Sequence, residues 1–303
     1  MEKPIKLSVV IPTWNGKELL KKNLPAVIKA CQAWSPKDKK AWEILVVDDA
    51  STDETVSFLK LKFPQVKVIK NKQNLRFAKA CNVGVARAKG DLIILFNNDV
   101  SPMKEFIKYL LPHFEDENVF AVGCREKNKV GGKIIYGGRS LGEFRRGFLV
   151  HWRAKNQEMT DTLWANGGNM IFDRKMWRKL KGMDELFRPA YWEDIDLSWR
   201  AKKRGWKVLF EPKSIVNHYH ETTNLKAFGQ KEMNIIAYKN QFLFVWKNAD
   251  LGMIVTHLLW LPFHFFKTLF SFDFLFTRGF ALALLQLPEV LAGRLSHWRS
   301  YRK

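Results

Sequence analysis

The stretch Ile44-Leu-Val-Val-Asp-Asp-Ala-Ser-Thr-Asp53 decides the fold class of this chain, because a hydrophobic run ends here in three carboxylates. A short apolar run followed by turn-forming residues is typical of a buried strand in a parallel sheet. Ligands of open α/β sheets bind at the carboxyl ends of such strands. Carboxylates suit a base, a ribose or a divalent cation, so the pattern indicates a nucleotide site.

The flanking sequence repeats the alternation of strand and helix. Strands are expected at Leu7–Ile11, Glu43–Val47, Val66–Lys70 and Asp91–Phe96, and helices at Lys17–Trp34, Glu54–Lys62 and Phe77–Ala88. This alternation predicts a parallel sheet flanked by helices. The last strand ends in Asn97-Asn-Asp99, which adds a second polar cluster to the same edge.

The second half is less regular. Glycines and basic residues break any clear period between Gly123 and Trp152, which predicts a mobile or β-rich insertion. The next legible unit is Trp164–Phe172, followed by an expected helix near Arg174–Leu180. Ile215–His218 is expected to end a further strand.

Composition limits the class of protein. The 303 residues are 47% hydrophobic and 27% charged, which suits one large α/β domain with a smaller appendage. The cysteines at 31, 81 and 124 lack CxxC spacing, so free thiols in the cytosol are expected rather than disulfides or a zinc site. The apolar run Leu7–Ile11 is too short for the core of a signal peptide.

A formal net charge of +21 predicts anionic surroundings. Nucleic acid, acidic lipid and phosphorylated substrates all qualify. Residues 125–155 contain nine Lys or Arg but only Glu126 and Glu143, which makes them a candidate anion-facing surface. The alternative is an ordinary solvated face.

Six motifs in order resemble the family 2 glycosyltransferases: Val9–Asn15, Val46–Asp53, Asn74, Phe77–Asn82, Leu95–Asp99 and Trp192–Arg200. The resemblance spans roughly residues 5–247 and implies a GT-A fold, which is Rossmann-like with a mostly parallel sheet flanked by helices, and an inverting mechanism. It implies a glycosyltransferase domain at 1–247, with a nucleotide-binding half to about 100 and an acceptor half beyond it. The C-terminal half resembles the rhamnosyltransferase-like subgroup.

The resemblance places nucleotide-sugar contacts in the first half of the chain. The residues implied are Pro12, Thr13, Asn15, Asp49, Ser51, Asp53, Asn74, Arg76, Asn82 and Asn98. Asp49 is favoured over Asp48 for direct contact. Turn chemistry around Asn15 and helix capping by Ser51 or Asp53 are the structural alternatives. Arg76 departs from the family pattern, which usually has glycine there, so the local backbone path is open.

The resemblance also implies a metal site for Mg²⁺ or Mn²⁺. Asp99 stands at the last position of a DxD-type motif, with neutral Asn97 at the first. Hard divalent ions prefer such oxygen ligands. His218 is the second candidate ligand, and His220 is an alternative two residues on. A structural role for either histidine also remains open.

An inverting transfer requires a base that deprotonates the acceptor hydroxyl. The family places it in the Glu193-Asp194 pair, and Asp194 is expected to act with Glu193 as its neighbour. The structural alternative for these acids is the first turn of a helix. The expected acceptor and donor-sugar loop residues are Trp164, Asn166, Gly167, Gly168, Trp192 and Arg200. An ordinary hairpin turn is the alternative for the two glycines.

The last 56 residues, 248–303, change character. Leu251–Phe266 carries no formal charge if its histidines are neutral, yet it is shorter than the roughly 20 residues of a membrane span and contains Pro262. Helices lying in the cytoplasmic leaflet are expected, with Trp260, Trp298 and the basic terminus at its boundary. A buried bundle, a dimer interface and a re-entrant hairpin are the alternatives.

Together these features predict a metal-dependent glycosyltransferase peripherally associated with the inner face of the cytoplasmic membrane. It would move a sugar from a nucleoside diphosphate to a lipid-linked or polysaccharide acceptor, as in envelope polysaccharide synthesis. A polyprenyl-phosphate glycosyltransferase is the enzymatic alternative. From another class come a nucleic-acid-binding protein, suggested by the charge and 12 tryptophans but lacking a recognised module, and an inert sugar-nucleotide or membrane scaffold.

Overall fold

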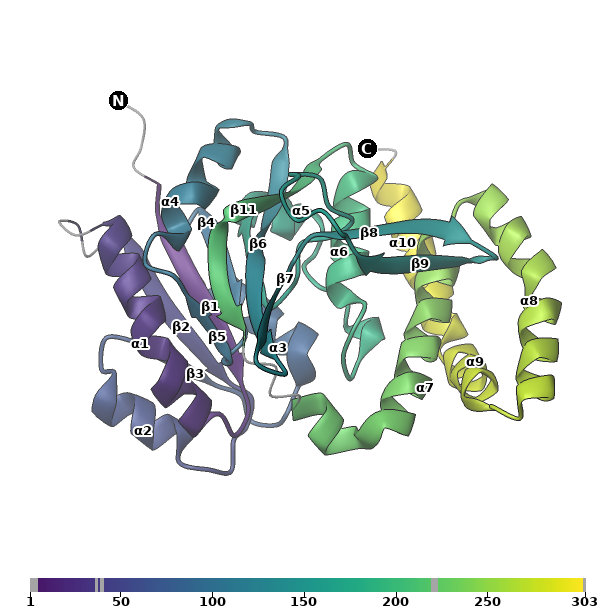
Figure 1. The fold of residues 1–303 in the computed structure, drawn as a ribbon, viewed down its shortest axis with the longest axis horizontal. Helices are drawn as coiled ribbons and strands as arrows, with labels where there is room; N and C mark the ends of the chain where they lie inside the picture. The colour runs from purple at the N-terminus through teal and green to yellow at the C-terminus, as the bar shows by residue number, and fades with distance from the viewer. Residues whose placement is uncertain (1–4, 36–37, 39–40, 219–222, 302–303) are drawn as a thin grey trace.

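A computed structural model describes residues 5–35, 38, 41–218 and 223–301. Its centre is a nine-stranded sheet in the order β3-β2-β1-β4-β10-β6-β11-β5, with β7 paired to β6 (Figure 1). Helices cover the sheet, and a second helical layer lies beyond β8 and β9 at the right of the view. The α/β class expected from the sequence is confirmed.

The first half forms as expected. Its parallel strands are β1 (Leu7–Thr13), β2 (Trp42–Asp48), β3 (Lys67–Lys70) and β4 (Leu92–Phe96). The helices between them are α1 (Lys17–Trp34), α2 (Thr55–Lys62) and α3 (Arg76–Arg87). Successive side chains of a strand point to opposite faces. Val9 and Val10 accordingly belong to different core clusters, one on each face of the sheet.

The second half adds antiparallel strands to the mostly parallel sheet. β10 (Asn169–Asp173) runs antiparallel to both β4 and β6 (Val119–Val130). β11 (Lys207–His218) is parallel to β6 but antiparallel to β5 (Val100–Pro102). Between β5 and β6 lie α4 (Phe106–Leu110) and the 3₁₀-helix η1 (Leu111–Glu115).

The segment without a clear period is β-rich. β6 continues past the sheet and pairs with β7 (Lys133–Gly137), and β8 (Ser140–Arg145) and β9 (Phe148–Arg153) form a separate two-stranded ribbon. The ribbon projects toward α8 (Figure 1), where the Gly147 carbonyl lies 2.8 Å from Nδ1 of His257. Both faces of β7 are largely exposed, which explains the missing alternation.

The remaining helices build a third core against the ribbon. They are α5 (Arg174–Lys179), the 3₁₀-helix η2 (Glu185–Phe187), α6 (Glu193–Lys202), α7 (Thr223–Asn248), α8 (Leu251–Ser271), α9 (Leu275–Leu285) and α10 (Leu287–Tyr301). α7 is kinked at Gly229, whose φ is 75°. Phe148, Phe242 and Phe276 share this core, so the C-terminal helices pack on the rest of the protein.

α8 is longer than the sequence suggested, because the helix continues through Pro262 for 21 residues. By length and composition it could cross a membrane, and α9 with Leu287–Arg294 passes the same test as one bent pair with an angle of 59° between its halves. Leu259, Phe266 and Phe270 are exposed on α8, whereas Phe276 and Ala283 of α9 are buried. The bundle alternative therefore describes α9, and α8 keeps an uncovered apolar surface.

A buried ion network ties α6 to α7. Nζ of Lys247 lies 2.6 Å from carboxylate oxygens of both Asp184 and Asp196, and Asp196 also accepts a 2.7 Å hydrogen bond from Arg200. Burial alone would raise the pKa of Asp196, but Arg200 and Lys247 lower it to about 2. The carboxylate is therefore charged and depends on its partners.

Lys247→Met is expected to reduce the free energy of unfolding by about 3 kcal/mol, because it leaves Asp196 and Asp184 without one shared cation in a buried site. Urea unfolding followed by circular dichroism measures the change. Lys207→Met is the control: its exposed ion pair with Asp116 is screened by solvent and should contribute far less. Equal losses in the two variants would contradict a structural role for the network.

Candidate active site

A cavity of about 570 Å³ opens at the carboxyl ends of β1, β2 and β4. It brings together residues that are far apart in the sequence. Those predicted from the sequence that line it are Pro12, Thr13, Asp49, Asn74, Arg76, Asn98, Asp99, Trp164, Asn166, Gly167, Gly168, Trp192, Glu193, Asp194 and His218. The cavity therefore joins the two halves of the chain at one site.

Asp49 organises the end of the cavity formed by β1 and β2. Its Oδ1 accepts hydrogen bonds from Asn71 and from the Leu75 backbone, and its Oδ2 accepts one of 2.9 Å from the Arg76 backbone. The φ of Arg76 is 68°, in the left-handed region that favours glycine. The backbone path typical of a glycine is thus kept with an arginine, whose guanidinium lies 5.6 Å from the centre of the Phe228 ring.

Five predicted residues are absent from the cavity lining and make local contacts instead. The Asn15 side chain accepts hydrogen bonds from the Thr52 and Asp53 backbone, while Ser51 accepts one from the Asn15 backbone. These bonds join the loops after β1 and β2. Asp53 accepts from the backbone of Thr55 at the start of α2, as a capping residue does.

The other two predicted residues outside the cavity lining are Asn82 and Arg200. Asn82 bonds to the backbone N–H and carbonyl of Met183. Arg200 is buried and its guanidinium is engaged by Asp196 and by the carbonyls of Leu180 and Gly182. Arg200 therefore steadies Asp196, the acid of the motif that faces away from the cavity, and not the Glu193-Asp194 pair.

The candidate metal site is a buried line of three side chains. Nε2 of His218 lies 3.5 Å from Oδ1 of Asp99, and Nδ1 lies 3.5 Å from Oε2 of Glu126. Burial would lower the pKa of His218, but Asp99 and Glu126 outweigh it and raise the pKa to about 9. Oδ1 of Asp99 is buried without a hydrogen-bond partner among the described residues. His220 lies outside that part of the chain.

These residues fit a divalent cation that also binds a substrate. A buried carboxylate oxygen without a hydrogen-bond donor is suited to a cation. Across the described ranges, no group of three His, Cys, Asp or Glu could enclose a metal by itself. Mg²⁺ commonly takes one or two carboxylates and completes its shell with phosphates and water. The arrangement therefore suits a cation shared with a diphosphate.

Glu193 and Asp194 begin α6 and face the same cavity. Oδ2 of Asp194 accepts a 3.0 Å hydrogen bond from the Gly167 backbone. Burial, followed by the charge of Asp194, raises the pKa of Glu193 to about 8, and burial also raises the pKa of Asp194. The pair therefore holds a proton at neutral pH, and the two backbone hydrogen bonds that Asp194 accepts, from Gly167 and Ile195, favour the charge on Asp194 and the proton on Glu193.

The loop before β10 needs its paired glycines. A Cβ on Gly168 would lie 2.5 Å from Nδ2 of Asn97, and one on Gly167 would lie 3.0 Å from Met183 and 3.3 Å from Cβ of Asp194. β10 begins at Asn169, and residues 164–168 form this loop. The glycines thus allow the loop to touch both the metal-side strand end and the acidic pair.

The raised pKa of Glu193 predicts a pH-dependent stability. Between about pH 4.5 and 8 the folded chain holds a proton on Glu193 that the unfolded chain has released. The contribution of Glu193 to the free energy of unfolding is therefore complete at low pH and is lost as pH rises through 8. The stability of Glu193→Gln relative to the natural protein should therefore increase from pH 5 to pH 8, as measured by thermal unfolding with a chelator. Exposed Glu158→Gln is the control, and a pH-independent difference for Glu193→Gln would contradict the prediction.

Several lining residues were missed by the sequence reasoning. They include Trp14, Phe77, His151, Tyr191 and Phe228. Glu126, which lies behind the cavity, was also missed. Its Oε1 accepts hydrogen bonds of 2.8 and 2.6 Å from the side chains of Asn166 and Asn169. Both Glu126 and His151 come from the segment without a period. The sequence shows Glu126 only as an isolated acid among basic residues. That pattern does not distinguish a functional-site residue from one member of a surface ion pair.

Part of the expected anion-facing surface is also structural. Arg139 is 5% exposed and forms an ion pair with Asp161, and Arg125 forms one with Glu158. Only the remaining basic residues of 125–155 are available to an anionic partner. The local charge excess therefore combines internal supports with surface cations.

The comparisons with known proteins agree with this site. A family model described as Glycosyl transferase family 2 matches residues 8–180, more than half of the chain, so the protein belongs to that family and is a glycosyltransferase. It is 26% identical over 259 residues to the dolichyl N-acetyl-alpha-D-glucosaminyl phosphate 3-beta-D-2,3-diacetamido-2,3-dideoxy-beta-D-glucuronosyltransferase of Methanococcus voltae, covering 77% of this chain and 72% of that protein.

A second relative is matched over a shorter stretch. The dolichol-phosphate mannosyltransferase of Pyrococcus furiosus is 32% identical over 133 residues, which is 43% of this chain. The aligned stretch spans about a third of that relative, 35% of its length.

Two solved structures share the fold. The mannosyltransferase PcManGT of Pyrobaculum calidifontis, in complex with GDP-Man and Mn²⁺, has a TM-score of 0.56 at 14% identity and covers 97% of this chain and 88% of its own. TarS of S. aureus in complex with UDP has a TM-score of 0.54 at 20% identity, covering 94% and 78%. The chain therefore has the GT-A fold.

Proposed function

We propose that the protein transfers a sugar, with inversion, from a nucleoside-diphosphate sugar to a lipid-linked or polysaccharide acceptor at the cytoplasmic face of a membrane. The observation that carries this proposal is one cavity lined by Asp49, Asp99, His218 and Asp194. Those side chains supply, in order, a nucleoside contact, two metal ligands and a base. Residues 1–247 form the catalytic part of this proposal, and 248–303 form its membrane-associating part.

The donor is held at the end of the cavity where β1 and β2 terminate. Thr13, Asp49 and Asn74 surround the base and ribose, and Arg76 approaches the phosphates. Asp99 would hold Mg²⁺ or Mn²⁺, and His218 would join it as a neutral ligand by releasing the proton that Asp99 and Glu126 stabilise in the metal-free site. When bound, such an ion neutralises the diphosphate as it departs. The Mn²⁺ in the PcManGT complex supports this assignment.

Asp194 acts on the acceptor. The Gly167 N–H holds its Oδ2, so the carboxylate has a fixed direction toward the cavity. It accepts the proton of the acceptor hydroxyl while that oxygen bonds to the anomeric carbon, and the nucleoside diphosphate leaves from the opposite face with the bonding electrons. Protonated Glu193 beside it adds no second negative charge that would repel the leaving phosphate.

A thermal-shift panel tests the donor site. UDP, GDP, dTDP and their sugars, including dTDP-rhamnose for the rhamnosyltransferase-like resemblance, are each measured with and without Mn²⁺ or Mg²⁺. Ligands that bind the native state raise the unfolding temperature by mass action. We expect one base to give a metal-dependent rise. Absence of any nucleotide-dependent rise would contradict the proposal.

Arg76→Gly tests the phosphate contact at this site. Glycine relieves a positive φ but adds freedom to the unfolded chain, so the free energy of unfolding should change by less than about 1 kcal/mol. Loss of the guanidinium should raise the KM for the donor about tenfold. Steady-state kinetics measures KM, and Lys72→Gly on the same loop, outside the cavity lining, is the control. An unchanged KM would remove Arg76 from the donor site.

The membrane proposal rests on the exposed apolar surface of α8. Phe263, Phe266 and Phe270 are 44%, 61% and 79% exposed, and Lys267 lies between them in sequence. Such a surface beside cations suits an anionic bilayer. Flotation with vesicles containing phosphatidylglycerol should retain the natural protein and release Phe266→Asp/Phe270→Asp. Equal flotation of both would redirect the search to a partner surface. The side chain of Trp298 lies outside the described residues.

A polyprenyl-phosphate acceptor is the second candidate, favoured by the likeness to dolichol-phosphate mannosyltransferase. The two candidates differ in the attacking group, which is a phosphate oxygen in one and a sugar hydroxyl in the other. Only the hydroxyl must lose a proton as it attacks at neutral pH. Mass spectrometry of products formed with undecaprenyl phosphate distinguishes them.

A further inference from the structure

His151 is a cavity residue contributed by the β8–β9 ribbon. Its ring lies edge-to-face against two tryptophans, with centroids 5.0 Å from Trp164 and 5.4 Å from Trp192. Its side chain is exposed at the cavity, and partial desolvation lowers its pKa, so the neutral imidazole offers one donor and one acceptor nitrogen. The three rings form a continuous aromatic wall in the cavity.

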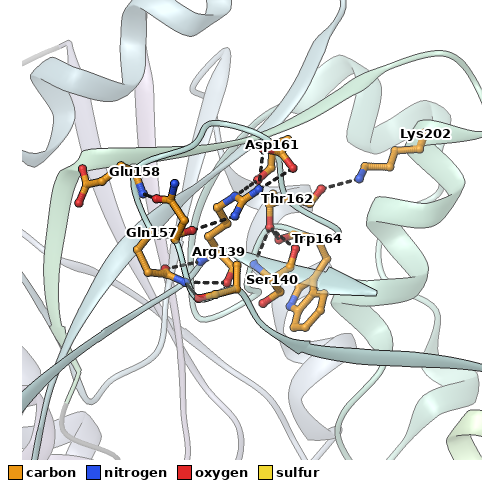
Figure 2. A network of polar contacts seen from close by, with 10 residues as sticks. Arg139, Ser140, Gln157, Glu158, Asp161, Thr162, Trp164 and Lys202 are labelled. Carbon is orange, nitrogen blue, oxygen red and sulfur yellow. Dashed lines mark hydrogen bonds and ion pairs between the residues drawn. The ribbon is translucent and has the colours of Figure 1, made fainter. Parts of the chain in front are cut away.

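The ribbon is fixed to the loop that carries Trp164. Figure 2 shows Arg139, just before β8, forming two 2.7 Å contacts with the carboxylate of Asp161. Thr162 then bonds through its hydroxyl to both the Ser140 backbone and the Trp164 carbonyl. Arg139 is 5% exposed, so this junction is an internal support rather than a surface contact.

The ribbon also approaches the loop more closely than a side chain would allow. Gly142 pairs with His151 across the ribbon. A Cβ on Gly142 would lie 2.6 Å from Cδ2 of Leu163. The sequence thus holds His151 at a set position relative to Trp164, through Arg139, Gly142 and the Asp161–Leu163 segment.

The aromatic wall stands on the side of the acidic pair. Trp192 directly precedes Glu193 and Asp194, and the Trp164 loop supplies the Gly167 N–H that holds Asp194. An acceptor hydroxyl within reach of Asp194 therefore places the rest of the acceptor beside these rings. A pyranose has an apolar face of C–H groups and a rim of hydroxyls, which suits an aromatic wall with a few polar atoms.

We propose that His151, with Trp164 and Trp192, forms a subsite for a sugar ring of the acceptor, and that the ribbon determines which ring is accepted. This inference rests on the proposed function and specifies its acceptor. The acceptor then presents a saccharide hydroxyl, on a lipid-linked or polymeric glycan, rather than a bare polyprenyl phosphate.

The test compares His151→Ala with Trp152→Ala. Trp152 is the next residue of β9, points to the opposite face, is 43% exposed and does not line the cavity. The probes are a panel of p-nitrophenyl glycosides and undecaprenyl phosphate, with the donor found by thermal shift. We expect a glycoside to be used, its KM to rise about tenfold in His151→Ala with kcat within threefold, and His151→Phe to recover most of the loss. Trp152→Ala should match the natural protein.

The outcomes separate this inference from the proposed function. Nucleoside diphosphate binding in each variant shows that the donor site is folded. If binding and transfer persist but the KM for the glycoside is the same in His151→Ala and Trp152→Ala, the subsite is overturned and the glycosyl transfer stands. Transfer to undecaprenyl phosphate with no glycoside used would also overturn it. If no variant or natural protein binds a nucleotide, the proposed function itself fails.

Discussion

Asp194→Asn is expected to lower kcat by about 10²–10⁴-fold, because the amide cannot accept the proton of the acceptor hydroxyl. The substitution keeps the size of the side chain and an oxygen able to accept the Gly167 hydrogen bond. Nucleotide binding should therefore be unchanged within about threefold. Release of nucleoside diphosphate under saturating donor measures kcat, and calorimetric titration measures binding.

Glu193→Gln is the matched comparison for this prediction. Glu193 is already protonated at neutral pH, so a neutral amide resembles its working state and kcat should fall far less than in Asp194→Asn. If the losses are reversed, Glu193 is the base and the raised pKa reflects its task. If Asp194→Asn keeps more than a tenth of kcat, the proton leaves by another route.

The fold was predictable wherever one physical pattern dominated. β1 and β4 are buried along their length and β2 is buried from Ile44 onward, and continuous apolar runs such as Ile93–Phe96 have no other stable location. The direction of β10 was not predictable in the same way. Asn169–Asp173 pairs antiparallel with two strands far away in sequence, and nothing in five residues specifies the orientation of a partner.

The site residues differ in predictability for the same reason. Asp49, Asp99 and Asp194 stand at element ends in recognisable motifs, and all line the cavity. Glu126 and His151 carry no such motif: Glu126 lies within β6 where that strand pairs with β7, and the position of His151 follows from a ribbon held by Arg139, Asp161 and Thr162. The backbone at Arg76 was also not predictable from the sequence, because an arginine stands where the family pattern usually has glycine. The hydrogen bond from the Arg76 N–H to Asp49 nevertheless maintains a left-handed φ of 68°.

Asp99→Ala is expected to abolish the metal-dependent part of the thermal shift produced by the nucleotide and to lower kcat at least about 100-fold. Oδ1 of Asp99 is a buried carboxylate oxygen without a hydrogen-bond donor, 3.5 Å from His218. An ion held there would supply several kcal/mol of charge stabilisation to the leaving diphosphate, and each 1.4 kcal/mol corresponds to about a factor of ten in rate.

The thermal shift keeps this prediction independent of turnover. Asp116→Asn, an exposed acid paired with Lys207, is the control and should behave as the natural protein in both measurements. The nucleotide should still bind Asp99→Ala weakly, since Thr13, Asp49 and Asn74 are unchanged, but Mn²⁺ should no longer strengthen that binding. An Asp99→Ala protein whose nucleotide binding still responds to Mn²⁺ would place the cation elsewhere in the cavity and reduce Asp99 to a partner of His218.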